Sequence, residues 1–585
     1  MRGAASLLTL VTAALLGGCG GSAQEAISVF PADGTRTASP STQLSFRGAD
    51  REALGDVTVE GSRSGRHRGR WRAHPDGRGA SFAPAEPFRP GERVTVRLER
   101  EVAGAGRRRS EFTVAGVPAG KRGPVAPAPR GKLRGVTAFR SRPDLRPPAL
   151  DVTTPARDPE LGAVFVAPKV GLSQKGPMIV APDGELVWFH PLAGTDQAFD
   201  FRAQRYRGKP VLTWWEGPLA DFHGRGVGRI YDTAYRPVAT VRAGNGYSAD
   251  LHELELTPRG TAWIAIYEAV PWDLRSRGGK RDGTVYDQIV QEVDVRTGAV
   301  LFEWHSMGEV GLDESYQPLP DKPGVIYDPV HINSVAEQPD GSILVSARHT
   351  HAVYAIDRKT GKIRWRLGGK RSSFDEGGEK LFAWQHDARR RADGAITLYD
   401  NAANGAKPGR ESRGLVIRLD EEKKTARIEQ ELTATPPVLG PTQGNLQNLP
   451  GGNSLVGWGG TSPRLTQFDR AGRTVFDARL RSPGSESYRA YRMPWRATPA
   501  ERPAVAVRSA RGRTTAYASW NGATEVARWR LLGGPDADRL RPLGEIRRSG
   551  FETALRVRGD AARLAVEALD EQGRALARSE TIPVR

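Results

Sequence analysis

Residues 331–345 read His331-Ile-Asn-Ser-Val-Ala-Glu-Gln-Pro-Asp-Gly341-Ser-Ile-Leu-Val345, which is the pattern of a β-hairpin. An apolar stretch leads to a turn with glycine and then to a second apolar stretch. The same phrase opens at three other places, His252, His386 and Asn445, with turn glycines at Gly260, Gly394 and Gly452. Gly341 and Gly394 lie 53 residues apart, and Gly394 and Gly452 lie 58 residues apart. This repetition indicates that one structural unit is used several times.

The repeated unit predicts an all-β fold, a six-bladed β-propeller over residues 151–500. A four-stranded sheet repeated every 40–50 residues or more is typical of propeller blades. A repeat near 58 residues divides this segment into about six units. A helical solenoid is excluded, because no segment sustains an apolar period of 3.6 residues.

Two further β domains are expected beside the propeller. Residues 24–115 contain short alternating strands separated by Pro, Gly and Asp turns, which predicts an Ig-like β-sandwich. Residues 501–585 resemble a fibronectin type III-like β-sandwich. Between the first sandwich and the propeller, residues 116–150 are rich in proline and predict an extended linker.

The first residues indicate export. Arg2 precedes a short apolar run, Ala4 to Leu16, which has the character of a secretory signal rather than of a membrane span. The end, Leu16-Gly-Gly-Cys19, resembles a lipobox, and Cys19 is the only cysteine in the chain. We therefore expect residues 1–19 to be a lipoprotein signal peptide, Cys19 to be lipidated, and the protein to be extracytoplasmic and anchored to the cell membrane. An ordinary signal peptide cleaved nearby is the alternative.

The formal net charge of +19 is spread along all 585 residues. A basic excess is compatible with nucleic acid, an anionic envelope or acidic ligands. No zinc spacing or nucleic-acid motif accompanies the charge, so no nucleic acid partner is expected.

Three of the ten histidines open repeat hairpins. The first strand of each propeller blade lines the central channel, so His252, His331 and His386 should converge on one point. Arg348 returns to the start of the hairpin that His331 opens. Asn333 lies two residues after His331 and should share its side of the strand, and Asn401 ends the hairpin of His386.

A ring of His, Arg and Asn suits a small tetrahedral anion. A neutral imidazole can attack a sulfuryl group, and Arg348 nearby would favour the neutral form. A single histidine at a strand start is more often structural, and a His cluster is also compatible with metal. No metal is predicted, because we find no carboxylate at an obvious ligand spacing. The remaining histidines outside this pattern receive no role: His67, His74, His190, His223 and His305.

Several phrases resemble the bacterial arylsulfotransferase family, as a divergent lipoprotein branch. They are Asp328-Pro-Val-His331-Ile-Asn333-Ser-Val, Ser346-Ala-Arg348-His349, Trp384-Gln385-His386-Asp387-Ala388, Ser487-Tyr-Arg-Ala-Tyr491-Arg-Met-Pro-Trp495 and Arg140-Ser-Arg-Pro143-Asp-Leu-Arg-Pro-Pro148. The resemblance covers about 140–500 and extends more loosely through 519–526.

The resemblance implies a six-bladed propeller that transfers sulfate from an aryl sulfate ester to a phenol without a nucleotide donor or cofactor. It implies that His386 is the nucleophile that forms a sulfohistidine, in a ping-pong mechanism. His252, His331, Asn333 and Arg348 would bind and polarise the sulfuryl group, with Asn401 as a further substrate-binding residue. Two features depart from the family: the chain cannot form the disulfide of the better-known periplasmic members, and the His252 phrase matches less closely.

A second class of function is a non-catalytic cell-envelope propeller that binds a protein or glycan partner, which the three-module layout favours. The sequence leaves a homodimer open. Residues 261–290, with Trp263, Tyr267 and Trp272, are an insertion that we expect to form a lid or aromatic wall over the site.

Overall fold

The computed structural model describes residues 25–120, 122–127, 131–322, 324–378, 380–403, 411–460, 464–510, 513–557 and 561–584. Residues 1–19, which are predicted to form the signal peptide and include Cys19, lie outside the described residues. The described chain is all-β, as predicted, and its only helices are five single-turn 3-10 segments, Glu52–Leu54, Pro159–Leu161, Arg275–Arg277, Leu312–Glu314 and Pro450–Gly452. In these residues we find no helix with the length and apolar character needed to cross a membrane.

The N-terminal part folds into two four-stranded sheets around one apolar core. The first sheet has the order β1 (Ser28–Phe30), β2 (Leu44–Arg47), β6 (Gly79–Pro84) and β5 (Gly69–Ala73). The second has the order β4 (Gly65–Arg66), β3 (Thr58–Gly61), β7 (Arg93–Val102) and β8 (Arg107–Thr113). β7 alternates buried and more exposed residues along most of its length, as expected for a strand that packs one face against the core.

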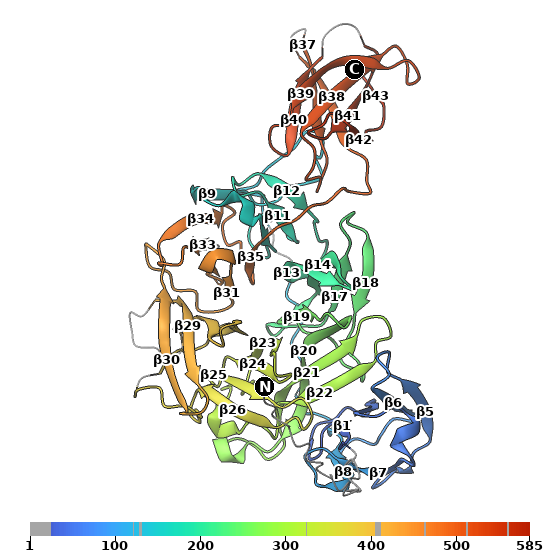
Figure 1. Ribbon diagram of the computed structural model, residues 1–585, viewed down its shortest axis with the longest axis vertical. Helices are drawn as coiled ribbons and strands as arrows, with labels where there is room; N and C mark the ends of the chain where they lie inside the picture. Colours follow the sequence, from blue (N-terminus) through green and yellow to red (C-terminus); the bar gives the residue numbers. More distant parts are fainter. Residues whose placement is uncertain are drawn as a thin grey trace, which may run out of the picture.

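The middle of the described chain contains six antiparallel sheets that follow one another around a common centre, which we call the ring (Figure 1). The first sheet comprises β10 (Ala163–Val166), β11 (Met178–Val180), β12 (Leu186–Phe189) and β35 (Ala490–Met493). The second comprises β13 (Gln197–Tyr206), β14 (Lys209–Gly217), β17 (Val227–Tyr231) and β18 (Pro237–Val241), with a small hairpin of β15 (Leu219–Ala220) and β16 (His223–Gly224) between β14 and β17.

The next three sheets each use four consecutive strands. The third comprises β19 (Leu254–Leu256), β20 (Thr261–Trp272), β21 (Gly283–Asp294) and β22 (Val300–His305). The fourth comprises β23 (Ile332–Glu337), β24 (Ile343–Ala347), β25 (Ala352–Ile356) and β26 (Ile363–Gly368). The fifth comprises β27 (His386–Arg390), β28 (Ile396–Asp400), β29 (Arg413–Asp420) and β30 (Thr425–Leu432).

The ring is closed by strands from both of its ends. The sixth sheet comprises β31 (Asn445–Asn448), β32 (Ser454–Gly457), β33 (Arg464–Phe468), β34 (Thr474–Leu480) and β9 (Leu150–Thr154). Here β9, from the start of the ring, pairs with β34, while β35, from its end, pairs with β10 in the first sheet. Each exchange adds backbone hydrogen bonds between residues more than 300 positions apart, so the start and the end of the ring are held together.

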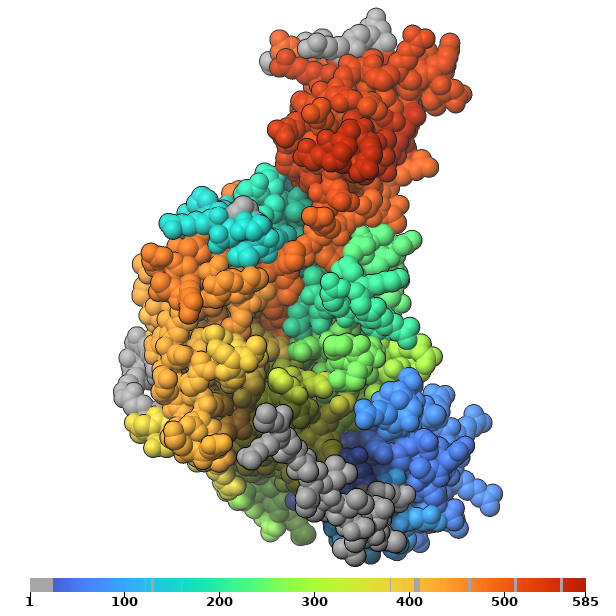
Figure 2. All heavy atoms as spheres, in the orientation of Figure 1, coloured from blue at the N-terminus to red at the C-terminus, as the bar shows by residue number. Residues whose placement is uncertain are grey.

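The C-terminal part forms a three-stranded and a five-stranded sheet around a core of its own. They comprise β36 (Ala504–Ala510), β37 (Arg513–Ser519) and β40 (Glu552–Arg556), and β38 (Arg528–Gly534), β39 (Arg541–Arg547), β41 (Arg563–Leu569), β42 (Ala575–Arg578) and the short β43 (Ile582–Pro583). Figure 2 shows this part projecting from one end of the ring and the N-terminal part packed against the other.

Polar side chains hold both outer parts to the ring. The Thr37 hydroxyl, from the N-terminal part, donates a hydrogen bond to Asp287 in β21 over 2.6 Å. Asn521, in the phrase at 519–526, donates to and accepts from the backbone of Phe189 in β12. Ser141, in the phrase at 140–148, lies 2.7 Å from the Ser519 hydroxyl. Two phrases that carried the resemblance therefore have a structural role, in joining the C-terminal part to the ring.

The proline-rich segment also pairs with a hairpin of the ring. Val125 forms a bridge with Ala220 in β15, and the Ala126 amide donates to the Leu219 carbonyl over 2.9 Å. Residues 122–127 therefore lie along the edge of the β15–β16 hairpin as a short extra strand, and this position brings them to the mouth of the cavity described below.

Candidate functional site

One cavity of about 860 Å³ collects the side chains that the sequence singled out. It is lined by His252, His331, His386 and Arg348, which come from the third, fourth and fifth sheets. His331 directly precedes β23, His386 begins β27, and His252 lies two residues before β19. The ring centroids of His252 and His331 are 5.1 Å apart. The common position of these histidines in successive sheets thus brings them to one place.

His386 is fully buried and is held in one orientation. Its Nδ1 lies 2.7 Å from the Asn401 Oδ1 and 3.1 Å from the Trp384 carbonyl, and both are acceptors, so Nδ1 carries the proton. Nε2 accepts the backbone N–H of Gln443 over 3.2 Å, and Gln443 also lines the cavity. Burial lowers the pKa of the His386 ring well below its ordinary value, and the positive charge of Arg348 lowers this pKa further. A neutral imidazole with a lone pair on the cavity side follows.

Arg348 places a buried positive charge beside the histidines. Its backbone amide donates to the His331 carbonyl over 2.8 Å. This hydrogen bond confirms the prediction that Arg348 lies opposite His331 at the open end of their hairpin. Its guanidinium stacks over Trp384 at 3.8 Å and lies 3.4 Å from His331 Nε2. Burial lowers the pKa of Arg348 to about 10, so the group remains charged at neutral pH. Among the described residues, no carboxylate lies within ion-pair distance of this guanidinium, which leaves its charge available for an anion.

The other two histidines are each paired with a carboxylate. His331 Nδ1 lies 2.5 Å from Asp328 Oδ2, and His252 Nδ1 is hydrogen-bonded to Asp250. Burial lowers the pKa of His331 well below its ordinary value, and the nearby His349 and Arg348 act in the same direction. Since the carboxylates take the Nδ1 protons, the Nε2 atoms are the ones that remain for chemistry.

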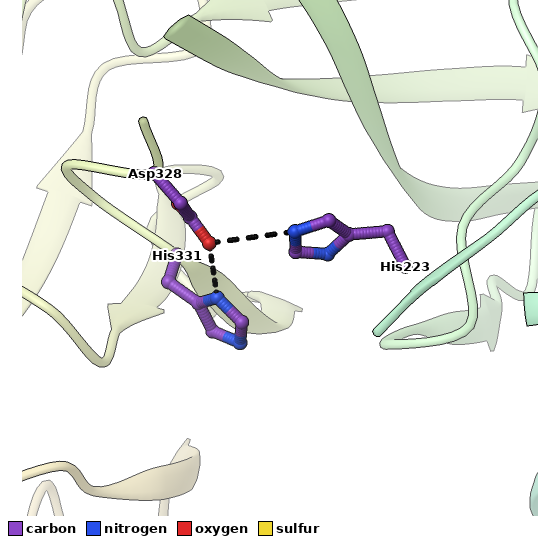
Figure 3. Close-up of side chains that lie close together, drawn as sticks. All are labelled: His223, Asp328 and His331. Carbon is purple, nitrogen blue, oxygen red and sulfur yellow. Dashed lines mark hydrogen bonds and ion pairs between the residues drawn. The ribbon is translucent and has the colours of Figure 1, made fainter. Parts of the chain in front are cut away.

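Asp328 lies against three histidines, His223, His331 and His349, and was missed by the sequence analysis. His223 Nε2, His331 Nδ1 and Asp328 Oδ2 all lie within 4.8 Å of one another (Figure 3). The expectation that no carboxylate lies at ligand spacing was wrong, because Asp328 stands three residues before His331 and a turn at His331 (φ 58°) folds it back. The set has the composition of a metal site.

Hydrogen bonding accounts for this cluster without an ion. His331 Nδ1 donates a hydrogen bond to the Asp328 carboxylate. A metal on His331 Nδ1 would force a proton onto Nε2, where Arg348 already points a donor at 3.4 Å. We therefore interpret the cluster as a carboxylate–imidazole pair with His223 against it.

His223 reaches the cavity from a different sheet. It begins β16, its ring stacks on Tyr267 at a centroid distance of 4.3 Å, and it meets Tyr286 edge-on at 4.5 Å. Burial lowers its pKa to about 3, so it is neutral. Tyr267 and Tyr286 belong to the β20–β21 hairpin, within the predicted aromatic wall, and both are buried in the same core cluster as Trp263. Of these three residues, only Tyr286 lines the cavity.

Asn333 and Asn401 are brought to the site but lie behind it. Both are completely buried, and neither lines the cavity. Asn401 holds the His386 ring and donates to the carbonyls of Gly440 and Gln443. Asn333 donates to the Gln385 carbonyl over 2.7 Å. Both therefore contact the groups that position His386.

A network of buried charges closes the centre of the ring behind the cavity. Arg489, whose side chain is completely buried, lies 2.8 Å from Asp200 and 3.2 Å from Glu253, and it donates to the Asn333 carbonyl over 2.9 Å. Arg202 and Arg389 each bind the same Glu253 over 2.7 Å. These charged groups bind one another and do not line the cavity, whose exposed lining residues Phe222 and Val325 mark its opening.

Backbone strain is concentrated at the cavity. His331, Trp384 and Gln443 all line it and have φ of 58°, 57° and 66°, a region that residues other than glycine seldom adopt. Each such residue costs on the order of 1–3 kcal/mol, which the surrounding structure must offset. Strain of this kind is typical of functional sites.

Fold and site together define an all-β protein whose cavity presents several buried histidines and the guanidinium of Arg348. Residues 202–481 match the family model described as arylsulfotransferase (ASST), which supports the resemblance seen in the sequence. The matched range contains all of the cavity histidines, Arg348, Asp328 and Gln443.

Comparisons with other proteins add little detail. No curated protein matches the chain. A protein of unknown function from Bacteroides caccae is 14% identical, with a TM-score of 0.35, over 56% of this chain and 97% of that one. An auxiliary nutrient binding protein from Bacteroides ovatus is 12% identical, with a TM-score of 0.27, over 84% of this chain and 95% of that one. A protein from Lactobacillus plantarum is 12% identical, with a TM-score of 0.27, over 72% and 97% of the two chains.

Proposed function

We propose that the protein transfers a sulfuryl group from an aryl sulfate ester to a phenol through a sulfohistidine at His386. The observation that carries this proposal is the pairing of a neutral, buried His386 with Arg348, a buried cation that has no carboxylate partner among the described residues. A sulfate ester supplies the negative charge that Arg348 lacks and the electrophile that His386 requires. The match of residues 202–481 to the arylsulfotransferase family model supports aryl sulfotransferase activity in general.

In the first step, the lone pair on His386 Nε2 attacks sulfur, and the bond from sulfur to the aryl oxygen breaks. Arg348 and the Gln443 backbone N–H bind the sulfuryl oxygens, as donors aimed at the charge of the transferring group. The N–H must turn from Nε2 to a sulfuryl oxygen, which is a small movement because both groups line the same cavity. Asn401 keeps the proton on Nδ1 throughout.

We assign His252 as the general acid that gives a proton to the departing phenolate, with Asp250 hydrogen-bonded to the Nδ1 of the same ring. In the second step, the acceptor phenol gives its proton to His252 while its oxygen attacks sulfur. The bond from sulfur to Nε2 then breaks, and the electron pair returns to His386. The proton lost in one half of the cycle is thus recovered in the other.

Turnover measurements test the overall reaction. With 4-nitrophenyl sulfate as donor, sustained release of 4-nitrophenol should require an added phenol, which should appear as its sulfate ester. His386→Ala should abolish both. Equal turnover by His386→Ala, or sulfate ester formation by direct transfer without any enzyme-bound intermediate, would contradict the mechanism. A wild-type protein without turnover would instead favour the non-catalytic, partner-binding alternative.

We further propose that the six sheets of the ring are the six blades of a β-propeller, flanked by Ig-like and fibronectin type III-like sandwiches. The sequence of residues 1–19 supports export and lipid attachment at Cys19, outside the described residues. Radiolabelled palmitate incorporation that is lost in Cys19→Ala would support the anchor, and unchanged incorporation would contradict it.

A further inference from the structure

The mouth of the cavity exposes apolar side chains where the rest of the described surface exposes few. Phe222 and Val325 both line the cavity, and their exposed fractions are 90% and 54%. Val125, at 47%, belongs to the segment that borders the β15–β16 hairpin. Only eight large apolar residues are exposed in the described chain, and these three are among them. The opening of the cavity is therefore unusually apolar for this surface.

Phe222 is held in place at this opening. It occupies the tip of the β15–β16 hairpin, and its two neighbours in sequence are fixed. Asp221 accepts the backbone N–H of Gly123 over 2.5 Å, and His223 stacks on Tyr267 and meets Tyr286 edge-on. The tip is therefore anchored on both sides of Phe222, while the Phe222 ring itself projects into solvent.

The turn does not explain why a phenylalanine stands at this tip. Asp221 and Phe222 have φ of 51° and 64°, and hairpin turns of this kind favour Asn, Asp and Gly. A bulky residue with positive φ is an outlier. Phe222 therefore has a strained backbone and an aromatic ring exposed to water. Contact of this ring with a ligand would remove it from water.

The size of the cavity indicates what that ligand is. A cavity of about 150 Å³ accommodates a benzene ring, whereas this one measures about 860 Å³. Its closed end holds the histidines and Arg348, while Phe222, Val325, Leu219 and Ile326 lie among its apolar lining. A single-ring phenol bound at the histidines would leave the apolar opening unused.

We propose that Phe222 and Val325 form a lip that binds the outer part of an extended aryl ligand, one with a second ring or a bulky apolar group. This inference rests on the proposed function, because the inner end of the ligand is the oxygen that carries the sulfuryl group. Phe222 is then a specificity-determining residue. It selects extended phenols over single-ring ones and takes no part in the transfer itself.

Binding measurements separate the lip from the chemistry. The dissociation constants of phenol and 4-phenylphenol would be measured by titration calorimetry for the wild-type protein, Phe222→Asn and Leu439→Ala. Asn removes the ring but suits the left-handed turn, so the hairpin should be preserved. Leu439 is the matched control, since it is 55% exposed and apolar but does not line the cavity.

The wild-type protein should bind 4-phenylphenol more tightly than phenol. Phe222→Asn should weaken 4-phenylphenol about 10- to 30-fold and leave phenol unchanged, as expected for the loss of one aromatic contact, while Leu439→Ala should change neither. Equal affinities for the two phenols in the wild-type protein, or an equal effect of Phe222→Asn on both, would overturn the lip. Phe222-dependent binding in a protein that transfers no sulfuryl group would support the lip and contradict the proposed function.

Discussion

Asn401 determines which nitrogen of His386 is free. Its side-chain oxygen takes the Nδ1 proton, and its amide is fixed by the carbonyls of Gly440 and Gln443. Asn401→Ala should therefore lower kcat about 100-fold or more, because the ring loses its tautomer and orientation, and should change the donor KM little. Asn448→Ala, which removes only a contact to Thr397, is the control. A rise in KM with unchanged kcat would instead make Asn401 a substrate-binding residue.

Arg348 controls the protonation of His386 as well as the binding of the anion. Burial and the Arg348 charge both lower the pKa of His386, so the nucleophile stays neutral well below pH 6.5. In Arg348→Gln the repulsion is lost, and the pKa of His386 should rise. The rate of 4-nitrophenol release in the first turnover should then begin to fall at a higher pH than in the wild-type protein. Arg348→Lys keeps the positive charge and should therefore keep the wild-type dependence of this rate on pH. If the rate falls at the same pH in the wild-type protein and in Arg348→Gln, Arg348 does not control the protonation of His386.

At the level of single residues, the sequence predicted which residues lie near the site but not where their side chains point. The rule that residues two apart share a side of a strand failed for Asn333, because the register of β23 shifts between Ile332 and Ser334. A similar shift lies between His386 and Arg389 in β27. Asp328 was within reach of the sequence, three residues before His331, but its contact depends on the left-handed turn at His331. His223 comes from another sheet, and no spacing in the sequence indicates it.

Among the elements, the β15–β16 hairpin depends on a glycine for its position. A Cβ on Gly224 would lie 2.3 Å from the Trp215 ring and 2.9 Å from the Leu251 amide nitrogen. The Gly224 amide also donates to Asp250, the partner of His252. Gly224→Ala should therefore displace the hairpin and lower kcat/KM about tenfold or more, with only a small change in Tm. Wild-type kcat/KM in this variant would show that the hairpin does not position the site.

Hairpin patterns were the most predictable elements. The apolar–Gly–apolar phrases at His252, His331, His386 and Asn445 each lead into the first two strands of a sheet, because alternation and turn glycines are local signals. The bridge of Val125 to Ala220 was not predictable, since it depends on where the proline-rich segment meets a distant hairpin. The same holds for the exchange of β9 and β35 that closes the ring.

For the whole molecule, the buried charges at the centre join the sheets to one another. Burial opposes ionisation of Glu253, but Arg389, Arg489 and Arg202 outweigh it and lower the pKa of this carboxyl. Arg489→Met would leave Asp200 and Glu253 undercompensated, and the loss of one partner of a buried ion pair costs about 3–5 kcal/mol. Calorimetry should show a markedly lower Tm for the ring. Arg539→Met, which removes an exposed ion pair with Asp536, should leave Tm unchanged, and an equal Tm in both variants would mean that the network is not needed for stability.

The most direct test of the account is the mass of the protein after brief exposure to 4-nitrophenyl sulfate without an acceptor. The wild-type protein should gain one SO₃ group on the peptide that contains His386, and added phenol should remove it. His331→Ala should gain the same group more slowly, and His386→Ala should not gain it. A wild-type protein that releases 4-nitrophenol without acquiring this mass, or that acquires it on another residue, would contradict the central claim.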